Sequence, residues 1–408
     1  MTDRMKRILF IVGFILSVFV IGFLLYIAFF RSAPVIQPTE QEILDEQTKN
    51  GFPTSKDGTQ RTIENESTAV TGLTQADEIA KGGVTQTIEL TTSAIFNPTL
   101  SGDGTRVQFY DEKEEKFYAI NASGEIVSLS DKKFPSVEKA TWDKTAEKAV
   151  LEFPDGSNII YDFSTEKQVT LPKHWEGFDF SPVGDELAAK SIAIDPDNRW
   201  IVLSNADGTN VKSIQALGEN ADKVTVNWSP NDQVVGFSDT ADGTGSLDRK
   251  IMIPLGKNQE NFKGLTVEGL HFSSSWAPDG KQLLYSVSGS YSNYRPLLWT
   301  VEATSSSMGK NRKSLGLNTW VEKCTWSNQT TAYCAVPQNL PENAGLQPVV
   351  FENLPDSLYK IDLTTGTSSL VAIPSERKSM KQLFVTKDES ALYFTNVQTG
   401  KLEFLKLK

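Results

Sequence analysis

Residues 276–285 read Trp-Ala-Pro-Asp-Gly-Lys-Gln-Leu-Leu-Tyr, and residues 228–238 read Trp-Ser-Pro-Asn-Asp-Gln-Val-Val-Gly-Phe-Ser. In both stretches an aromatic residue ends a short apolar run, turn-forming residues follow, and a second apolar run returns. Pro presets φ at the start of a tight turn, and Asp, Asn and Gly tolerate the remaining turn positions. Each stretch therefore predicts two antiparallel strands joined by a tight turn.

The same pattern recurs, with weaker matches, along most of the chain. Its anchor positions are 100, 142, 180, 228, 276, 326 and 385, so successive copies begin 38 to 59 residues apart. Third and fourth apolar runs follow each turn, for example at 296–301 and 369–374. One four-stranded antiparallel sheet cannot bury both of its faces alone, which is typical of a propeller blade. The sequence predicts an all-β, seven-bladed β-propeller over residues 84–408, with six or eight blades as the alternatives.

The two ends of the repeat region indicate how the ring closes. The last copy stops directly after its third strand, at 402–407, and a strand-like segment at 85–90 precedes the first copy. We expect this segment to add the missing outer strand to the last blade. Such a closure removes an open sheet edge and sets the number of blades at seven.

The aromatic-Ser-Pro-Asp-Gly turn with its following apolar strand resembles the TolB-like, WD-like propeller repeats of bacterial envelope proteins, best at residues 276–285. The resemblance covers residues 85–408, and the whole chain looks like membrane-anchored bacterial propellers. It differs from eukaryotic WD repeats, because the Gly-His and Trp-Asp pairs are missing from their usual places. The resemblance implies a propeller and protein–protein contacts. It implies no functional residues, since the matching positions are structural turns.

Residues 8–30 form an uncharged apolar run of 23 residues. At about 1.5 Å per residue a helix of this length spans roughly 34 Å, enough for a hydrocarbon core of about 30 Å. Three basic residues precede the run and Arg31 follows it, which favours a cytoplasmic N-terminus. The sequence predicts a cytoplasmic stub (1–7), a single transmembrane helix (8–30), a flexible linker (31–83) and an extracytoplasmic propeller at the cell membrane. A cleaved signal peptide is the alternative, but its apolar region would be shorter.

The composition excludes several classes of function. The formal net charge of −11 argues against a nucleic-acid binder, which usually carries a basic patch. Two Cys and two His residues are too few for an ordinary structural zinc site. The linker is polar and has few aromatic residues, so it cannot bury enough apolar surface to offset its ordering entropy.

Cys324 and Cys334 flank the turn of the sixth repeat. Counting outward from Gln329 places Trp326 opposite Ala332 and Cys324 opposite Cys334 on paired strands. Directly opposed side chains are close enough for a disulfide in a twisted ribbon, and an extracytoplasmic compartment permits oxidation. We predict a disulfide between Cys324 and Cys334, with two buried free thiols as the alternative.

The loops between the second and third strands predict a binding face. They are short in blades one, two, three and seven, and long in blades four to six, at about 239–249, 288–296 and 337–355. Long loops inside a compact fold are usually functional or disordered. The predicted partner-binding residues are Tyr291, Tyr294, Arg295 and Phe351. Tyr and Arg are enriched in interface hot spots, and apolar content suggests that the blade-six loop meets a partner or covers the domain as a lid.

No catalytic, cofactor or metal site is predicted. His174 and His271 lie at blade junctions, where lone histidines are usually hydrogen-bonded connectors. Asp239, Asp242 and Asp248 share one loop, but their spacing fits no known calcium-binding loop. We therefore expect a membrane-tethered scaffold or receptor for a protein or an envelope polymer. The alternative is a propeller enzyme, a lyase or hydrolase, with a site at the central channel.

Overall fold

The structure is a computed structural model that describes residues 16–21, 23, 76–241 and 248–408. The chain divides into two units, Met1–Val70 and Thr71–Lys408. In the first unit the described residues are helical. None of the helices in the described ranges is long and apolar enough to cross a membrane. Most of the predicted span at 8–30 and most of the predicted linker lie outside those ranges.

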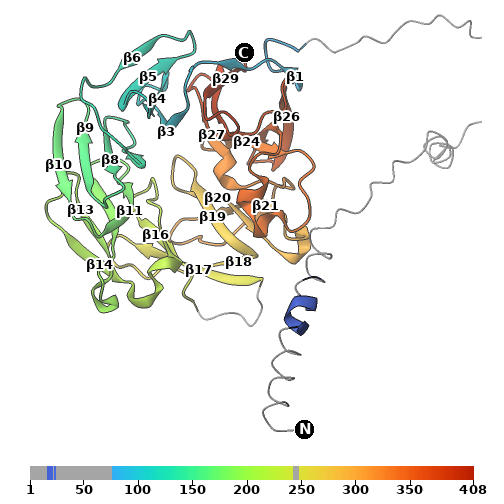
Figure 1. The fold of residues 1–408 in the computed structure, drawn as a ribbon. Helices are drawn as coiled ribbons and strands as arrows, with labels where there is room; N and C mark the ends of the chain where they lie inside the picture. The colour runs from blue at the N-terminus through green and yellow to red at the C-terminus, as the bar shows by residue number, and fades with distance from the viewer. Residues whose placement is uncertain (1–15, 22, 24–75, 242–247) are drawn as a thin grey trace, which may run out of the picture. The chain divides into compact units, whose positions relative to one another are not determined.

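The second unit is a ring of seven sheets, and the prediction of an all-β, seven-bladed propeller is confirmed (Figure 1). Apart from the closing strands described below, neighbouring strands within each blade run antiparallel in order of sequence. Blade one contains β3 (Ile95–Leu100), β4 (Arg106–Asp111), β5 (Lys116–Asn121) and β6 (Ile126–Ser128). Blade two contains β7 (Lys139–Trp142), β8 (Lys148–Glu152), β9 (Asn158–Asp162) and β10 (Lys167–Leu171). Blade three contains β11 (Trp175–Phe180), β12 (Glu186–Ser191), β13 (Trp200–Asn205) and β14 (Lys212–Ala216), with the short helix η1 (Pro196–Asn198).

The other four blades follow the same plan. Blade four contains η2 (Gly218–Lys223), β15 (Val224–Val226), β16 (Val234–Ser238), β17 (Arg249–Gly256) and β18 (Leu265–Glu268). Blade five contains β19 (Leu270–Trp276), β20 (Gln282–Ser288), η3 (Ser290–Ser292), β21 (Pro296–Glu302) and β22 (Lys313–Ser314). Blade six contains η4 (Val321–Lys323), β23 (Cys324–Asn328), β24 (Thr331–Pro337), η5 (Ala344–Leu346), η6 (Pro348–Phe351), β25 (Asp356–Asp362) and β26 (Thr367–Pro374). Blade seven contains β27 (Met380–Val385), β28 (Ala391–Asn396) and β29 (Leu402–Lys406).

The ring closes as predicted, but the closing segment serves two blades. β2 (Ile88–Glu89) pairs antiparallel with β29 and completes blade seven. β1 (Gly83–Thr85) pairs parallel with β26 and gives blade six a fifth strand. The single strand predicted at 85–90 is therefore split, because Gln86 turns away and its N–H donates to the Asp77 carbonyl at 2.9 Å. The segment consequently covers the outer edges of two neighbouring blades.

Seven apolar clusters form the core, and each lies between two neighbouring blades of the described ring. The repeated tryptophan adds a polar link at several of these interfaces. The indole N–H of Trp142 donates to the Asn97 carbonyl of blade one at 2.9 Å. The indole of Trp326 donates to Ser275 Oγ of blade five at 3.0 Å. Trp142 and Trp326, two of the anchor residues that mark the repeats, thus link a blade to its neighbour.

One loop prediction is wrong. The second-to-third strand loop of blade three was expected to be short, but it spans residues 192–199 and is one residue longer than the blade-five loop, 289–295. The strand β12 ends at Ser191, and the apolar residue Ile194 lies in the loop, where it is 99% exposed. The sector of long loops therefore extends over blades three to six.

Candidate functional site

Hydrogen bonds join the predicted binding loops of blades four, five and six. We call this surface the loop platform and define it by its described residues: 239–241 and 248, 289–295, and 338–355. Residues 242–247 of the blade-four loop, including Asp242, lie outside the described ranges. The blade-five loop is central, because it contacts both of the others.

Tyr294 connects the blade-five loop to blade four. Its hydroxyl donates to the Asp248 carboxylate, with distances of 3.2 and 3.1 Å to the two oxygens. The backbone N–H of Ser290 donates to the same carboxylate at 3.2 Å. The hydrogen bond to Asp248 raises the pKa of Tyr294, because it stabilises the protonated phenol. Tyr294 also holds a left-handed backbone conformation, with φ of 53°.

Arg295 and its neighbours connect the blade-five loop to blade six. The Arg295 Nε–H donates to the Leu340 carbonyl at 2.8 Å, and the Asn293 amide donates to Glu342 at 2.8 Å. The Gly345 N–H donates to the Tyr294 carbonyl at 2.9 Å. A Cβ on Gly345 would lie 1.9 Å from Ser288 Oγ, so glycine is required for this close approach.

Tyr291 is the most exposed of the three predicted blade-five residues, at 46%. Its hydroxyl donates to the Glu268 carbonyl at 2.6 Å, and its ring lies edge-on to Trp299 with centroids 5.9 Å apart. Burial raises the pKa of Tyr291 above its ordinary value. The ring is therefore held in place and still presents a face to solvent, as a partner-binding residue requires.

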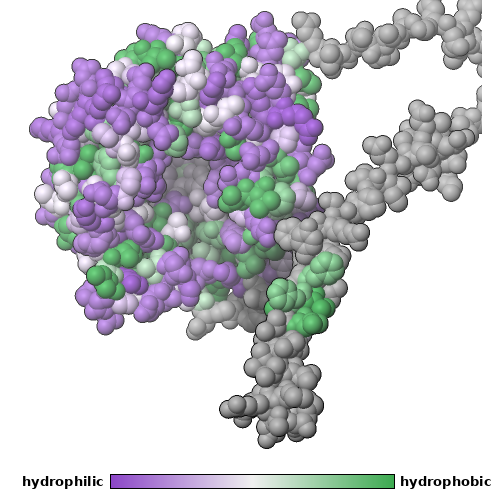
Figure 2. Space-filling model, viewed as in Figure 1, coloured by the Kyte–Doolittle hydropathy of each residue, from purple (hydrophilic) through white to green (hydrophobic). Residues whose placement is uncertain are grey.

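The apolar residues of the blade-six loop differ in their exposure. Phe351 is only partly exposed, whereas Val349, Val350 and Leu346 are 73, 65 and 37% exposed. Figure 2 shows apolar surface beside the central opening, where Figure 1 draws the orange segments of the chain. At the same time Ala344 and Gly345 are buried against blade five. The loop thus covers the domain on one side and presents apolar side chains on the other.

A buried ion pair holds the base of the blade-six loop. Lys323 Nζ lies 2.7 and 2.9 Å from the two carboxylate oxygens of Asp356, and the Met380 N–H donates to the same carboxylate at 2.7 Å. Burial raises the pKa of Asp356, and the nearby Lys323 ammonium opposes this shift. The Ser379 hydroxyl contacts both this carboxylate and the Glu352 carbonyl. The pair therefore connects the end of the loop to blade seven.

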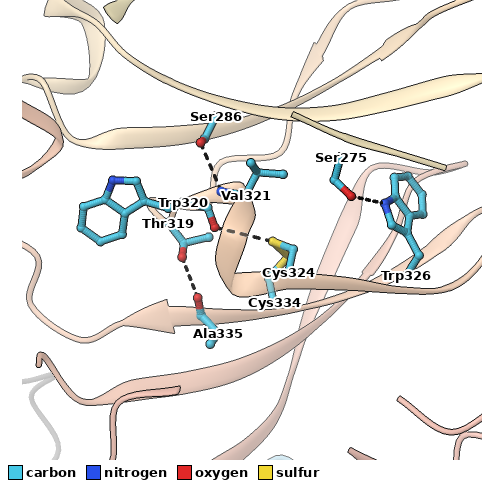
Figure 3. Close-up of a disulfide and its surroundings, with 9 residues drawn as sticks. All are labelled: Ser275, Ser286, Thr319, Trp320, Val321, Cys324, Trp326, Cys334 and Ala335. Atoms are coloured by element: carbon cyan, nitrogen blue, oxygen red, sulfur yellow. Dashed lines mark hydrogen bonds between the residues drawn. A yellow bond between two sulfur atoms is a disulfide. The ribbon is translucent and has the colours of Figure 1, made fainter. Parts of the chain in front are cut away.

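The predicted disulfide is confirmed (Figure 3). Cys324 and Cys334 are bonded with their Cα atoms 4.0 Å apart, and the strand register pairs Cys324 with Cys334 and Trp326 with Ala332. The surrounding hydrogen bonds lead to blade five: the Val321 N–H donates to Ser286 Oγ at 3.1 Å. The disulfide thus lies where blade six joins blade five, close to the strand that leads into the long loop.

The remaining predicted residues do not assemble into a metal site. No group of three or more His, Cys, Asp or Glu residues that could hold a metal ion occurs within the described residues. His174 is an exposed connector whose carbonyl accepts from the Ile192 N–H at 2.7 Å. His271 differs from this prediction, because it lines a cavity. Sequence reasoning missed that cavity, since its walls come from three blades.

The comparisons with known proteins give the fold. No family model matches the chain, and no curated protein matches it. An oligogalacturonate lyase in complex with manganese aligns with a TM-score of 0.53 and 13% identity over 79% of this chain and 93% of its own. The Swd1 β-propeller domain of Myceliophteria thermophila aligns with a TM-score of 0.52 and 11% identity over 79% of this chain and all (100%) of its own. Kuenenia stuttgartiensis hydrazine synthase aligns with a TM-score of 0.52 and 12% identity over 83% of this chain and 99% of its own.

These solved structures share the architecture of this chain, but their names describe different kinds of protein. Proteins of unrelated activity share the ring at 11–13% identity. A propeller supports many functions, so the fold does not select among them. Any evidence for function therefore lies in the side chains of this chain, and the loop platform is the surface where they gather.

Proposed function

We propose that this chain is a membrane-tethered, extracytoplasmic β-propeller that binds a protein partner through the loop platform. The observation that carries the proposal is a preorganised surface with exposed apolar side chains. Val349 and Val350 are among the most exposed apolar residues of the described propeller, at 73 and 65%. An exposed apolar surface on an ordered loop is typical of a protein-interaction site.

Preorganisation supports the same conclusion. The three loops are joined by contacts between residues 45 to 49 positions apart in sequence, namely Arg295 with Leu340, Tyr294 with Asp248, and Asn293 with Glu342. A partner that binds ordered loops avoids most of the entropy cost of fixing them. Tyr294 and Arg295 hold neighbouring loops together. Replacing either residue would therefore disturb the platform itself as well as any interface, so a test of the interface needs other positions.

The proposed location rests on the sequence and on the disulfide. The apolar run at 8–30 with basic residues before it favours an anchored chain with an external C-terminal domain. A disulfide between Cys324 and Cys334 fits an oxidising compartment. Protease added to intact cells should degrade the propeller, and it should degrade a cytoplasmic control protein only after lysis. Protection of the propeller in intact cells would contradict the proposed orientation.

Site-specific photo-cross-linking tests the proposed interface. A photoreactive amino acid at Val349 should give a cross-linked adduct of discrete mass in the native host. Val183 is the matched control: it is also 73% exposed, but it lies in the turn between β11 and β12 on the opposite face of the ring. Val350→Asp should remove the Val349 adduct while leaving the folded ring intact. The same adducts from both positions, or none from Val349, would refute the proposal.

The alternative, an enzyme acting at the central channel, is less well supported. Two similar solved structures are oligogalacturonate lyases, but their likeness extends to the fold alone. Among the described residues, no Ser, Thr or Cys side chain is hydrogen-bonded to a histidine side chain. We therefore retain the interaction module as the proposed function.

A further inference from the structure

A cavity of about 590 Å³ lies between blades five, six and seven, at the end of the ring where the long loops lie. The inner strands β19 and β27 and the segment before β23 form its walls, and the blade-six loop adds Pro348 and Glu352. The side chains that carry the argument are His271, Trp320, Glu322, Lys381 and Gln382. Its volume falls within the range of small-ligand sites, roughly 300–1,000 Å³.

Two of these residues hold an unusual backbone conformation. The inner strands of blades one, three, five and seven each contain a bulge near the end where the strand begins. In each bulge one residue has positive φ: Asn97 (48°), Gly177 (64°), His271 (55°) and Gln382 (51°). The four positions are therefore equivalent, and they differ in the residue that fills them.

The residues in the four bulges differ in how readily they adopt positive φ. Glycine enters the left-handed region freely, and asparagine does so more readily than most residues. Blades one and three use these residues. Histidine visits this region less readily than glycine, and glutamine is less suited still. Gln382, the least suited of the four to positive φ, therefore holds its place at a conformational cost, and it lines the cavity together with His271.

The polar groups of the cavity are free to meet a ligand. Among the described residues, the side chains of Glu322, Lys381 and Gln382 form no hydrogen bond or ion pair with another part of the protein, and neither do those of His271 and Trp320. Lys323 also lines the cavity, but Asp356 pairs with its ammonium. The free groups include donors, acceptors and an amide that is both, beside the aromatic faces of Trp320 and Phe272.

We propose that this cavity binds a neutral saccharide. Hydroxyl groups donate and accept, so they match a mixed set of unpaired donors and acceptors better than an ion does. Aromatic rings offer an apolar face to the C–H groups of a sugar ring. The charges of Glu322, Glu352 and Lys381 have both signs, and this does not favour a polyanion or a polycation. Pro348 and Glu352 of the loop platform also line this cavity, so the two proposed sites are neighbours, and the saccharide site is argued from His271, Trp320, Glu322, Lys381 and Gln382 alone.

The binding test uses the purified full-length chain in detergent. Saturation-transfer NMR and calorimetry are run with cellobiose, maltose and N,N′-diacetylchitobiose as neutral probes. Digalacturonate and Lys-Lys serve as the anionic and cationic arms. At least one neutral disaccharide should bind, and Gln382→Asn and Trp320→Leu should each weaken it by about tenfold, the loss of one well-made contact. Asn97→Gln, at the equivalent bulge of blade one, should leave binding unchanged.

A second measurement does not depend on the choice of sugar. Gln382→Asn places in blade seven the residue that blade one already uses, so it should raise Tm by about 1–3 °C while it weakens binding. Asn97→Gln should lower Tm. Binding of digalacturonate or Lys-Lys alone, binding of no probe, or a lower Tm for Gln382→Asn would each overturn the proposal. The Val349 cross-linked adduct should persist in Gln382→Asn, which separates failure here from failure of the loop interface.

Discussion

The loops of blades four to six and the corresponding turns of blades one, two and seven are built in different ways. In the short turns, an Asp or Asn at the start accepts hydrogen bonds from the backbone two or three residues later. Asp111 accepts from Lys113 N–H at 2.9 Å, and Asp155 accepts from Ser157 N–H at 2.9 Å. In the long loops, the important contacts join residues on different blades, such as Arg295 and Leu340.

This difference separates local from tertiary stabilisation. A short turn is stable because its own side chains accept hydrogen bonds from its backbone N–H groups. Its conformation is therefore determined by a few adjacent residues. A long loop lacks these local hydrogen bonds and depends on hydrogen bonds to the loops of neighbouring blades. The long-loop sector should therefore fail as a unit when one cross-blade contact is lost, while a damaged short turn should affect little beyond itself.

The largest effect is expected for Asp356→Ala at the base of the blade-six loop. It leaves the Lys323 ammonium buried without its partner and should reduce the free energy of unfolding by about 3–5 kcal/mol. Denaturant unfolding measures this loss. Adding Lys323→Met should restore part of it, because the unpaired charge is then gone. Asp155→Ala breaks an ion pair whose members are 65 and 64% exposed, and it is the control. Equal losses for the two single variants would contradict the argument.

Removal of the disulfide should have the next largest effect. The bonded cysteines are 10 residues apart, so Cys324→Ala with Cys334→Ala should cost about 2–3 kcal/mol through loss of the loop constraint on the unfolded chain. Unfolding is measured with and without reductant. The reduced wild-type protein should match the double variant, and the variant should not respond to reductant. A wild-type protein that is unaffected by reductant would refute the disulfide.

Much of the fold could be predicted because the repeat is local. The Pro, Asp and Gly residues after Trp276 define a turn without reference to the rest of the chain, and the strands on either side follow from apolar runs. The disulfide followed from counting residues outward from Gln329. The closing strand could also be placed. Its division between blades six and seven could not, because it depends on how the edge of β26 lies beside that of β29.

The site was harder to predict, because its contacts join residues that are far apart in the sequence. Tyr291 is exposed, as the predicted partner-binding role requires, but Tyr294 and Arg295 have partners on other blades that sequence does not reveal. Val349 and Val350 are more exposed than Phe351, and this ranking depends on how the loop folds back, which the sequence does not show. The cavity beside Gln382 combines residues from three blades. A glutamine inside a strand gave no signal, since its positive φ is visible only in the structure.

A smaller effect is expected for Arg295→Ala, which removes one contact between blades five and six. The Arg295 Nε–H bond to the Leu340 carbonyl and the more distant Glu342 pair should together contribute about 1 kcal/mol. Hydrogen exchange at the Asn343 and Gly345 amides should accelerate about fivefold, with little change in Tm. Arg199→Ala is the matched control, because Arg199 Nε–H donates at 2.9 Å to Ala193 within its own loop. Arg199→Ala should accelerate hydrogen exchange in blade three alone. If Arg295→Ala accelerated exchange in blade five alone, the proposed contact between blades five and six would be contradicted.

The smallest effect is expected for Asp155→Ala in the short turn of blade two, and it should depend on pH. The Ser157 hydroxyl, the Ser157 N–H and Lys173 all hydrogen-bond to this carboxylate and lower its pKa. A carboxyl group whose pKa is lower in the folded protein stabilises the fold above its unfolded pKa of about 3.9, and that contribution disappears as pH falls through the folded value. The wild-type protein should therefore exceed the variant in Tm by at most about 2 °C at pH 7, because the group is exposed. Calorimetric scans should show this gap narrowing below about pH 4. A gap that is constant down to pH 2 would mean that the side chain acts through its shape, and that the short turns do not depend on the charge of their acidic residues.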